Sequence, residues 1–120
     1  DLGLVNEAEP YTRRMNRGLI LGPDGHKMSK SKGNVIDPDK EVERLGADSV
    51  RMYLAFIGPY NEVGAYPWNP DGLAGVRRFL EKVWRLKQKI GGENENSAIL
   101  HQTIKKVGDE IKSMKMNTGV

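Results

Sequence analysis

The sequence has 120 residues, 38% of them hydrophobic and 29% charged, which is enough for one small domain or pieces of two. It contains no cysteine, so disulfides and thiolate metal sites are excluded, and its two scattered histidines form no zinc motif. We therefore expect no bound metal ion. The net charge of +3 permits a nucleic-acid partner without requiring one. No apolar stretch approaches the roughly 18 residues of a membrane span, so we expect no membrane partner. The absence of cysteine fits a reducing, cytoplasmic setting.

The first 17 residues show no sustained hydrophobic period, and we expect a loop there with one short helix around residues 11–16. An apolar run at residues 18–21 is followed by strong turn residues at 22–25. This pattern predicts a small β-hairpin whose second strand begins at His26. Because the chain begins at Asp1 without methionine and stops soon after a helical pattern, we interpret it as a fragment of a longer protein.

A polar loop with the sequence Lys-Met-Ser-Lys-Ser-Lys-Gly-Asn follows at residues 27–34. It places the positive charges of Lys27, Lys30 and Lys32 beside two hydroxyl groups in one short segment, which suits the binding of phosphate. A solvated basic surface loop is the alternative interpretation. Gly33 and Asn34 adopt left-handed backbone angles at low cost, so we expect them to act as a hinge. The motifs G-x-x-x-x-G-K-[ST] and G-x-G-x-x-G are absent from the sequence.

Two short helices are predicted after this loop. Asp37 and Pro38 form a typical helix start, as N-cap and first helical residue, and Gly46 ends this helix after residue 45. A second helix is expected from Ala47, because the apolar residues at positions 50, 53, 54 and 57 share one face. The glycine and proline at positions 58 and 59 end it.

Residues 59–71 contain three prolines and are predicted to be a linker without a regular element, which places a domain boundary there. A long helix is expected over residues 72–90, with an apolar face that includes Phe79 and Val83. A basic stripe runs along another side of this helix, and Glu81 is expected to pair with Arg85. The stripe is either a solvated face or a surface that binds nucleic-acid phosphates, and its residues are Arg77, Arg78, Lys82, Arg85 and Lys89.

A polar connection at residues 91–96 leads to a further helix with Ser97 as its predicted N-cap. Apolar residues at positions 100, 104, 107, 111 and 114 follow the spacing of a packing seam. We therefore expect this helix to pack antiparallel against the helix over residues 72–90. Trp84, at the edge of the earlier helix's apolar face, is interpreted as core or interface packing. His101 lies beside the seam and is expected to be exposed.

The order Lys-Met-Ser-Lys-Ser at residues 27–31 resembles the second signature of the class I aminoacyl-tRNA synthetases. The pattern G-A-D-x-x-R-x-Y at residues 46–53 resembles its usual continuation in the synthetases for leucine, isoleucine, valine and methionine. The resemblance implies that Lys27 and Lys30 are catalytic and stabilise the ATP phosphates as the aminoacyl-adenylate forms. It also implies an ATP-binding segment made of Lys27, Met28, Ser29, Lys30 and Ser31, with ATP and Mg²⁺ as substrate.

Within that family, Lys32 and the segments at residues 71–86, 100–107 and 116–118 resemble the leucyl-tRNA synthetases most, although residues 66–70 depart from their pattern. The implied partners are leucine, ATP and tRNA(Leu), with no DNA. Isoleucyl, valyl and methionyl enzymes remain alternatives, as does a non-catalytic helical module that binds tRNA. Since the ATP-gripping H-I-G-H motif is absent here, we expect this segment by itself not to activate leucine.

The fold implied by the resemblance is mainly α with a small β-hairpin. Residues 1–60 would form the end of a Rossmann-like catalytic domain, with the lysine loop and the stem-contact helices. Residues 61–71 would be a linker, and residues 72–120 would supply the first two helices of an anticodon-binding helical bundle.

Overall fold

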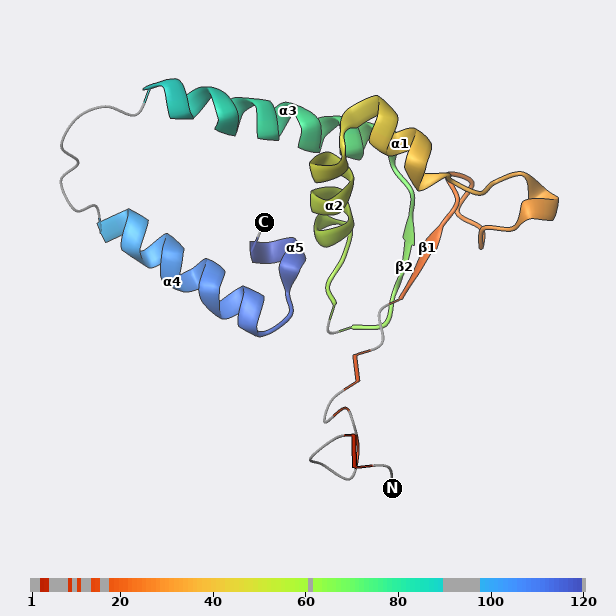
Figure 1. The fold of residues 1–120 in the computed structure, drawn as a ribbon, viewed down its shortest axis with the longest axis horizontal. Coiled ribbons are helices and arrows are strands. Elements are labelled where there is room, and N and C mark those ends of the chain that lie inside the picture. Colours follow the sequence, from red (N-terminus) through yellow and green to blue (C-terminus); the bar gives the residue numbers. More distant parts are fainter. Residues whose placement is uncertain are drawn as a thin grey trace.

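The computed structural model describes residues 3, 4, 9, 11, 14, 15, 18–60, 62–89 and 98–119. Within these described residues, two short strands and five α-helices follow one another in the order β1, α1, α2, β2, α3, α4 and α5 (Figure 1). Their bounds are β1 Leu19–Leu21, α1 Pro38–Leu45, α2 Ala47–Phe56, β2 Ala65–Pro67, α3 Pro70–Leu86, α4 Ala98–Lys112 and α5 Met116–Gly119. Single 3-10 turns lie at η1 Lys30–Lys32 and η2 Lys87–Lys89. The mainly α class with a small β element is confirmed.

The predicted limits of α1 are confirmed. The side chain of Asp37 accepts a hydrogen bond of 3.1 Å from the backbone N–H of Asp39, and Pro38 occupies the first helical position. Gly46 then has a backbone φ of 87°, which residues other than glycine rarely adopt, and the helix ends there. Helix α2 begins at the next residue, as predicted.

The two strands pair in a way that differs from the predicted hairpin. Strand β1 pairs in parallel with β2, and Leu19 lies opposite Ala65. The turn after β1 is present, but its hairpin is reduced to one antiparallel bridge between Leu21 and Lys27. The prediction that residues 59–71 hold no regular element is therefore wrong. Three residues are too short for a periodic pattern, and β2 forms because long-range backbone bonds hold it, such as that from Trp68 N to Leu21 O at 3.0 Å.

One small apolar core joins these elements. Val50 and Tyr53 of α2, Trp68 after β2, and Leu73 of α3 are buried and contact one another. The rings of Tyr53 and Trp68 meet edge to face with centroids 4.9 Å apart. The hydroxyl of Tyr53 accepts a hydrogen bond of 2.8 Å from the backbone N–H of Asn69, and burial raises the pKa of this phenol. The core therefore links α2 to the start of α3.

Helix α3 starts two residues earlier than the apolar period indicated. Asn69 is its N-cap, since its side-chain oxygen accepts hydrogen bonds from the backbone N–H groups of Asp71 and Gly72 at 3.0 and 3.1 Å. Pro70 occupies the first helical position. The capping signal of Asn69 and Pro70 lies in a segment whose other prolines are typical of a linker, which masks the start of the helix in the sequence.

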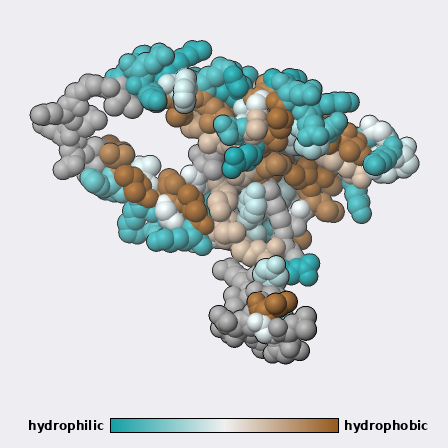
Figure 2. Space-filling view, viewed as in Figure 1, coloured by the Kyte–Doolittle hydropathy of each residue, from teal (hydrophilic) through white to brown (hydrophobic). Residues whose placement is uncertain are grey.

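Helices α3 and α4 do not pack against each other in the part of the chain that the structure describes, so the predicted antiparallel pair is wrong. Helix α4 contacts α5, which in turn contacts α2 (Figure 1). Ile104 of α4 and Trp84 of α3 are 60% and 70% exposed, so Trp84 is not a core residue. Figure 2 shows apolar residues along the side of α4 that faces the opening towards α3. The radius of gyration is 18.9 Å, compared with roughly 14 Å for a compact domain of this length.

Some predicted features fall wholly or partly outside the described residues. The connection at residues 91–96, the cap at Ser97 and the end of the long helix at Ile90 lie outside them entirely. The short helix predicted around residues 11–16 lies partly outside them, and Tyr11, Arg14 and Met15 are described and not helical.

Candidate functional site

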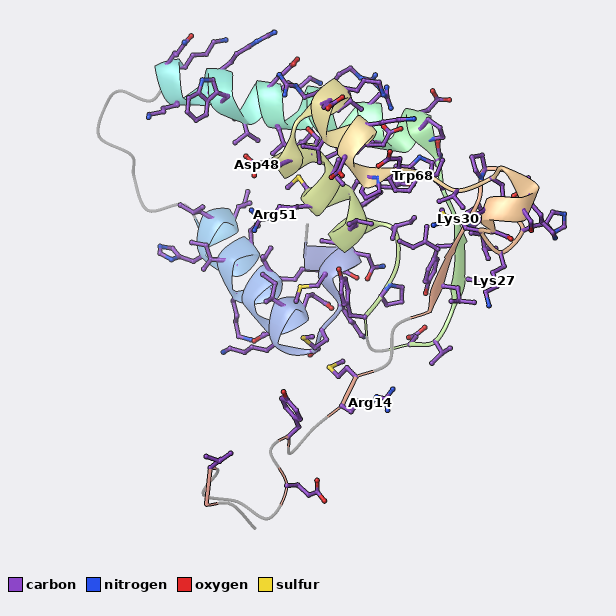
Figure 3. All side chains as sticks on the ribbon, turned by 45° about the vertical axis from the view of Figure 1, so that its right-hand side comes forward. Arg14, Lys27, Lys30, Asp48, Arg51 and Trp68 are labelled. Carbon is purple, nitrogen blue, oxygen red and sulfur yellow. The ribbon has the colours of Figure 1, made fainter. Side chains whose placement is uncertain are left out.

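The lysine loop protrudes at the end of the molecule that lies away from α4 (Figure 1). Figure 3 shows Lys27 and Lys30 together at this end. Met28, near the start of the loop, and Ile36, just after its end, are half-buried and pack against the core of Val50, Tyr53, Trp68 and Leu73. The loop is therefore fastened to the core at two points, and the residues between them are mostly exposed.

A tight turn supports the loop at its start. The backbone N–H of Gly22 donates to the carbonyl of His26 at 2.8 Å, and that of Gly25 donates to the carbonyl of Gly22 at 2.9 Å. The carboxylate of Asp24 accepts a hydrogen bond of 3.0 Å from the backbone N–H of His26. That hydrogen bond lowers the pKa of Asp24 below its ordinary value, and a second hydrogen bond, from the Asn34 side chain, lowers it further.

The second half of the loop forms the 3-10 turn η1. The backbone N–H of Lys32 donates to Ser29 O at 3.1 Å, and Gly33 ends the turn with a left-handed φ of 67°. The hydroxyls of Ser29 and Ser31 share a hydrogen bond of 2.8 Å. Lys27, Lys30 and Lys32 are exposed and form no ion pair within the described part of the chain, so their charges are available to an external anion.

Asn34 has a different structural role from the predicted one of a hinge residue. Its backbone is not left-handed, so within the predicted hinge only Gly33 takes that conformation. Its side-chain oxygen accepts from Ser29 N at 2.8 Å, and its amide nitrogen donates to both carboxylate oxygens of Asp24 and to the carbonyl of Lys27. Sequence reasoning missed this bridge between turn and loop. An amide side chain next to a left-handed glycine was the available signal.

The basic residues of α3 divide into two groups. Arg77 donates to Leu45 O at 3.2 Å and to Glu81 at 2.8 Å, so it braces α3 against the end of α1. Glu81 therefore pairs with Arg77 instead of Arg85, and the hydrogen bond from Arg77 lowers the pKa of Glu81. The other members of the stripe are exposed and make no hydrogen bond or ion pair in the described ranges, and they are Arg78, Lys82, Arg85 and Lys89.

A groove of about 510 Å³ lies beside this brace, between the start of α2 and the middle of α3. Its lining includes Gly46, Ser49, Arg77 and Trp84. The ammonium of Lys87 lies 5.3 Å from the ring centre of Trp84, so the exposed indole carries a cation on its face.

Comparison with known proteins identifies the family. Residues 3–64 match the family model of the class I tRNA synthetases for isoleucine, leucine, methionine and valine. The chain belongs to this family. The leucine–tRNA ligase of Pelodictyon phaeoclathratiforme is 46% identical over 134 aligned residues, a match that covers 100% of this chain and 16% of that protein. The leucine–tRNA ligase of Deinococcus radiodurans is 43% identical, with 98% of this chain and 15% of that protein covered.

A solved structure agrees with these relatives. The chain is similar to the LeuRS in the ternary complex LeuRS–tRNA–LeuAMS of Agrobacterium radiobacter K84, with a TM-score of 0.74 and 32% sequence identity. The match covers 87% of this chain and 16% of that one. The chain thus spans about 16% of the length of the curated relatives it matches.

The family match ends at residue 64, just before β2. In this synthetase chain it therefore includes the lysine loop, α1 and α2, whereas the basic stripe of α3 lies beyond it. Within the described residues, no three His, Cys, Asp or Glu side chains gather as metal ligands would. None of the described helices combines the length and apolar character needed to cross a membrane.

Proposed function

We propose that this chain is part of a leucyl-tRNA synthetase and that its lysine loop acts in the activation of leucine by ATP. The observation that carries the proposal is the loop itself, whose three lysines are exposed and form no ion pair among the described residues, while Met28 and Ile36 anchor the segment against the core. The specificity for leucine is supported by the curated relatives named above, which are leucine–tRNA ligases. ATP and leucine are thus the proposed small substrates.

The chemistry of activation suits these side chains. A carboxylate oxygen of leucine forms a bond to the α-phosphorus of ATP, and the bond from that phosphorus to pyrophosphate breaks. Negative charge grows on the α-phosphate and on the leaving pyrophosphate. The ammonium groups of Lys27 and Lys30 would stabilise that charge, with Ser29 and Ser31 as hydroxyl donors and Met28 as the loop's anchor. Mg²⁺ would enter with the ATP phosphates.

The exposed part of the stripe on α3 is the proposed contact with tRNA(Leu). Arg78, Lys82, Arg85 and Lys89 lie along one helix without internal partners, which suits the spaced charges of a phosphate backbone. Arg77 is assigned to bracing α3 instead. We further propose that residues 1–60 end the catalytic domain, that residues 61–71 connect the domains, and that residues 72–120 begin the anticodon-binding bundle of a cytoplasmic enzyme.

The test is amino-acid-dependent ATP–pyrophosphate exchange by the intact enzyme, with leucine compared with isoleucine, valine and methionine. We expect leucine to give the fastest exchange. Lys30→Ala should lower that exchange about 100-fold or more, because a charge contact made in the transition state is lost. Lys40→Ala, on the exposed side of α1, is the matched control and should leave exchange unchanged.

Each other outcome has a distinct meaning. Fastest exchange with isoleucine, valine or methionine would assign the chain to one of those sister enzymes. Full exchange by Lys30→Ala would refute the role of the loop. No exchange with any amino acid would favour the alternative of a non-catalytic module that binds tRNA.

A further inference from the structure

We propose that Asn34 is a positioning residue that holds the lysine loop in shape by fastening it to the turn at Asp24. This inference rests on the proposed function, since it concerns the same loop. It adds a residue outside the proposed ATP-binding segment of residues 27–31, whose role is to determine where Lys27 and Lys30 lie.

The side chain of Asn34 uses both ends of its amide. Its oxygen accepts a hydrogen bond of 2.8 Å from the backbone N–H of Ser29. Its nitrogen donates to the two carboxylate oxygens of Asp24 at 3.2 and 3.1 Å, and to the carbonyl of Lys27 at 3.3 Å. Asn34 therefore joins the turn at Asp24 to the loop at Lys27 and Ser29.

These contacts lie directly beside the proposed catalytic lysines. The Lys27 carbonyl and the Ser29 N–H flank Met28, and Lys30 follows at once. The hydrogen bond from Gly33 N to Lys30 O at 3.2 Å is made within the loop and does not fix it to its surroundings, and the bridge between Lys27 and Leu21 ties only the loop's first residue to β1. Asn34 therefore links the backbone on both sides of Met28 to a turn that directly follows β1 and is closed by the hydrogen bond from Gly22 N to His26 O.

The attachment of the loop to the core is separate from this link. Met28 and Ile36 provide it through apolar packing, whereas Asn34 contributes polar contacts between partly exposed groups. Loss of the Asn34 side chain should therefore leave the fold in place and free the lysines to move. A loss of positioning lowers kcat more than it changes substrate binding elsewhere in the enzyme.

The experiment measures leucine-dependent ATP–pyrophosphate exchange by the intact enzyme carrying Asn34→Ala. We expect kcat to fall about 10-fold, with the KM for leucine and the thermal midpoint unchanged. Asn34→Asp keeps the oxygen that accepts from Ser29 N but loses the N–H donor to Asp24. Its kcat should therefore fall at least as much as that of Asn34→Ala. Asn69→Ala is the matched control, because Asn69 bonds to backbone N–H groups at α3, away from the loop. It should leave kcat unchanged.

A double-mutant cycle with Asp24→Ala tests the link itself. If Asn34 acts through Asp24, adding Asp24→Ala to the Asn34→Ala variant should lower kcat much less than Asp24→Ala lowers it in the wild-type enzyme. Full additivity would overturn the link, as would an unchanged kcat in Asn34→Ala. Lys30→Ala in the same assay separates the two proposals. A loss with Lys30→Ala and none with Asn34→Ala refutes the positioning role alone, whereas full exchange with Lys30→Ala refutes the proposed function and the positioning role with it.

Discussion

A single methyl group at Gly18 should disrupt the parallel pair of β1 and β2. Gly18 directly precedes β1, whose first residue, Leu19, donates its N–H to Gly64 O at 2.9 Å. A Cβ at Gly18 would lie 2.5 Å from the nitrogen of Gly64 and would overlap its carbonyl group. Since ordinary contacts between such atoms are about 3.5 Å, and the carbonyl oxygen of Gly64 would lie closer to this Cβ than the nitrogen does, the two backbones would have to separate by more than about 1 Å.

The cost follows from that separation. The hydrogen bond from Leu19 to Gly64 would be lost, at about 1 kcal/mol, and the displaced strand would add an overpacking cost of about 1–3 kcal/mol. We therefore expect Gly18→Ala to lower the free energy of unfolding by about 2–4 kcal/mol. Gly108→Ala is the matched control, because its Cβ would meet nothing within 4 Å inside α4. It should raise the free energy of unfolding by up to about 1 kcal/mol.

The assay is urea unfolding of the chain, followed by the fluorescence of Trp68 in a Trp84→Phe background. Trp68 is 6% exposed in the core and its backbone N–H bonds to β1, so its signal reports the pairing of the strands. The slope of the free energy with urea should stay constant between variants if stability alone changes. A Gly18→Ala variant as stable as Gly108→Ala would refute the predicted clash and the strand register behind it.

Two further predictions concern charge. The folded pKa of Asp24 is lowered, so its contacts stabilise the fold above the ordinary value of 3.8 and lose that effect as pH falls through the lowered pKa. Asn34→Ala should raise this pKa in an NMR titration, and an unchanged value would contradict the contact. Replacing Lys82 and Arg85 with alanine should lower the salt dependence of tRNA binding by about one to two units of slope. Lys105→Ala removes an ammonium that is paired with Asp109 and should leave the salt dependence of tRNA binding unchanged. An equal change in salt dependence for both variants would contradict tRNA binding by the stripe.

The elements with strong local signals were predictable. Asp37, Pro38 and Gly46 encode the limits of α1 through capping, a preset φ and a left-handed end, and each of these effects acts within a few residues. The lysine loop was also evident from its residue order. Its shape was not, because the bonds of Asn34 join positions five to ten residues apart along a segment without a repeating pattern.

Long-range pairing and packing depended on the tertiary structure. Strand β2 is held by backbone hydrogen bonds to β1, from which it is separated along the chain by α1 and α2. Nothing in the sequence of residues 65–67 alone indicates such a partner. Likewise, the apolar seam of α4 correctly predicted a helix but not the element that packs against it. An apolar period indicates which face of a helix is buried, but it does not identify the neighbour that buries it. The sequence by itself thus determined α1, the start of α2, most of α3, the existence of α4, the lysine loop and the family resemblance. The tertiary structure decided the strand pairing, the separation of α3 from α4 and the contacts that hold the loop, because these depend on atoms that meet only after folding.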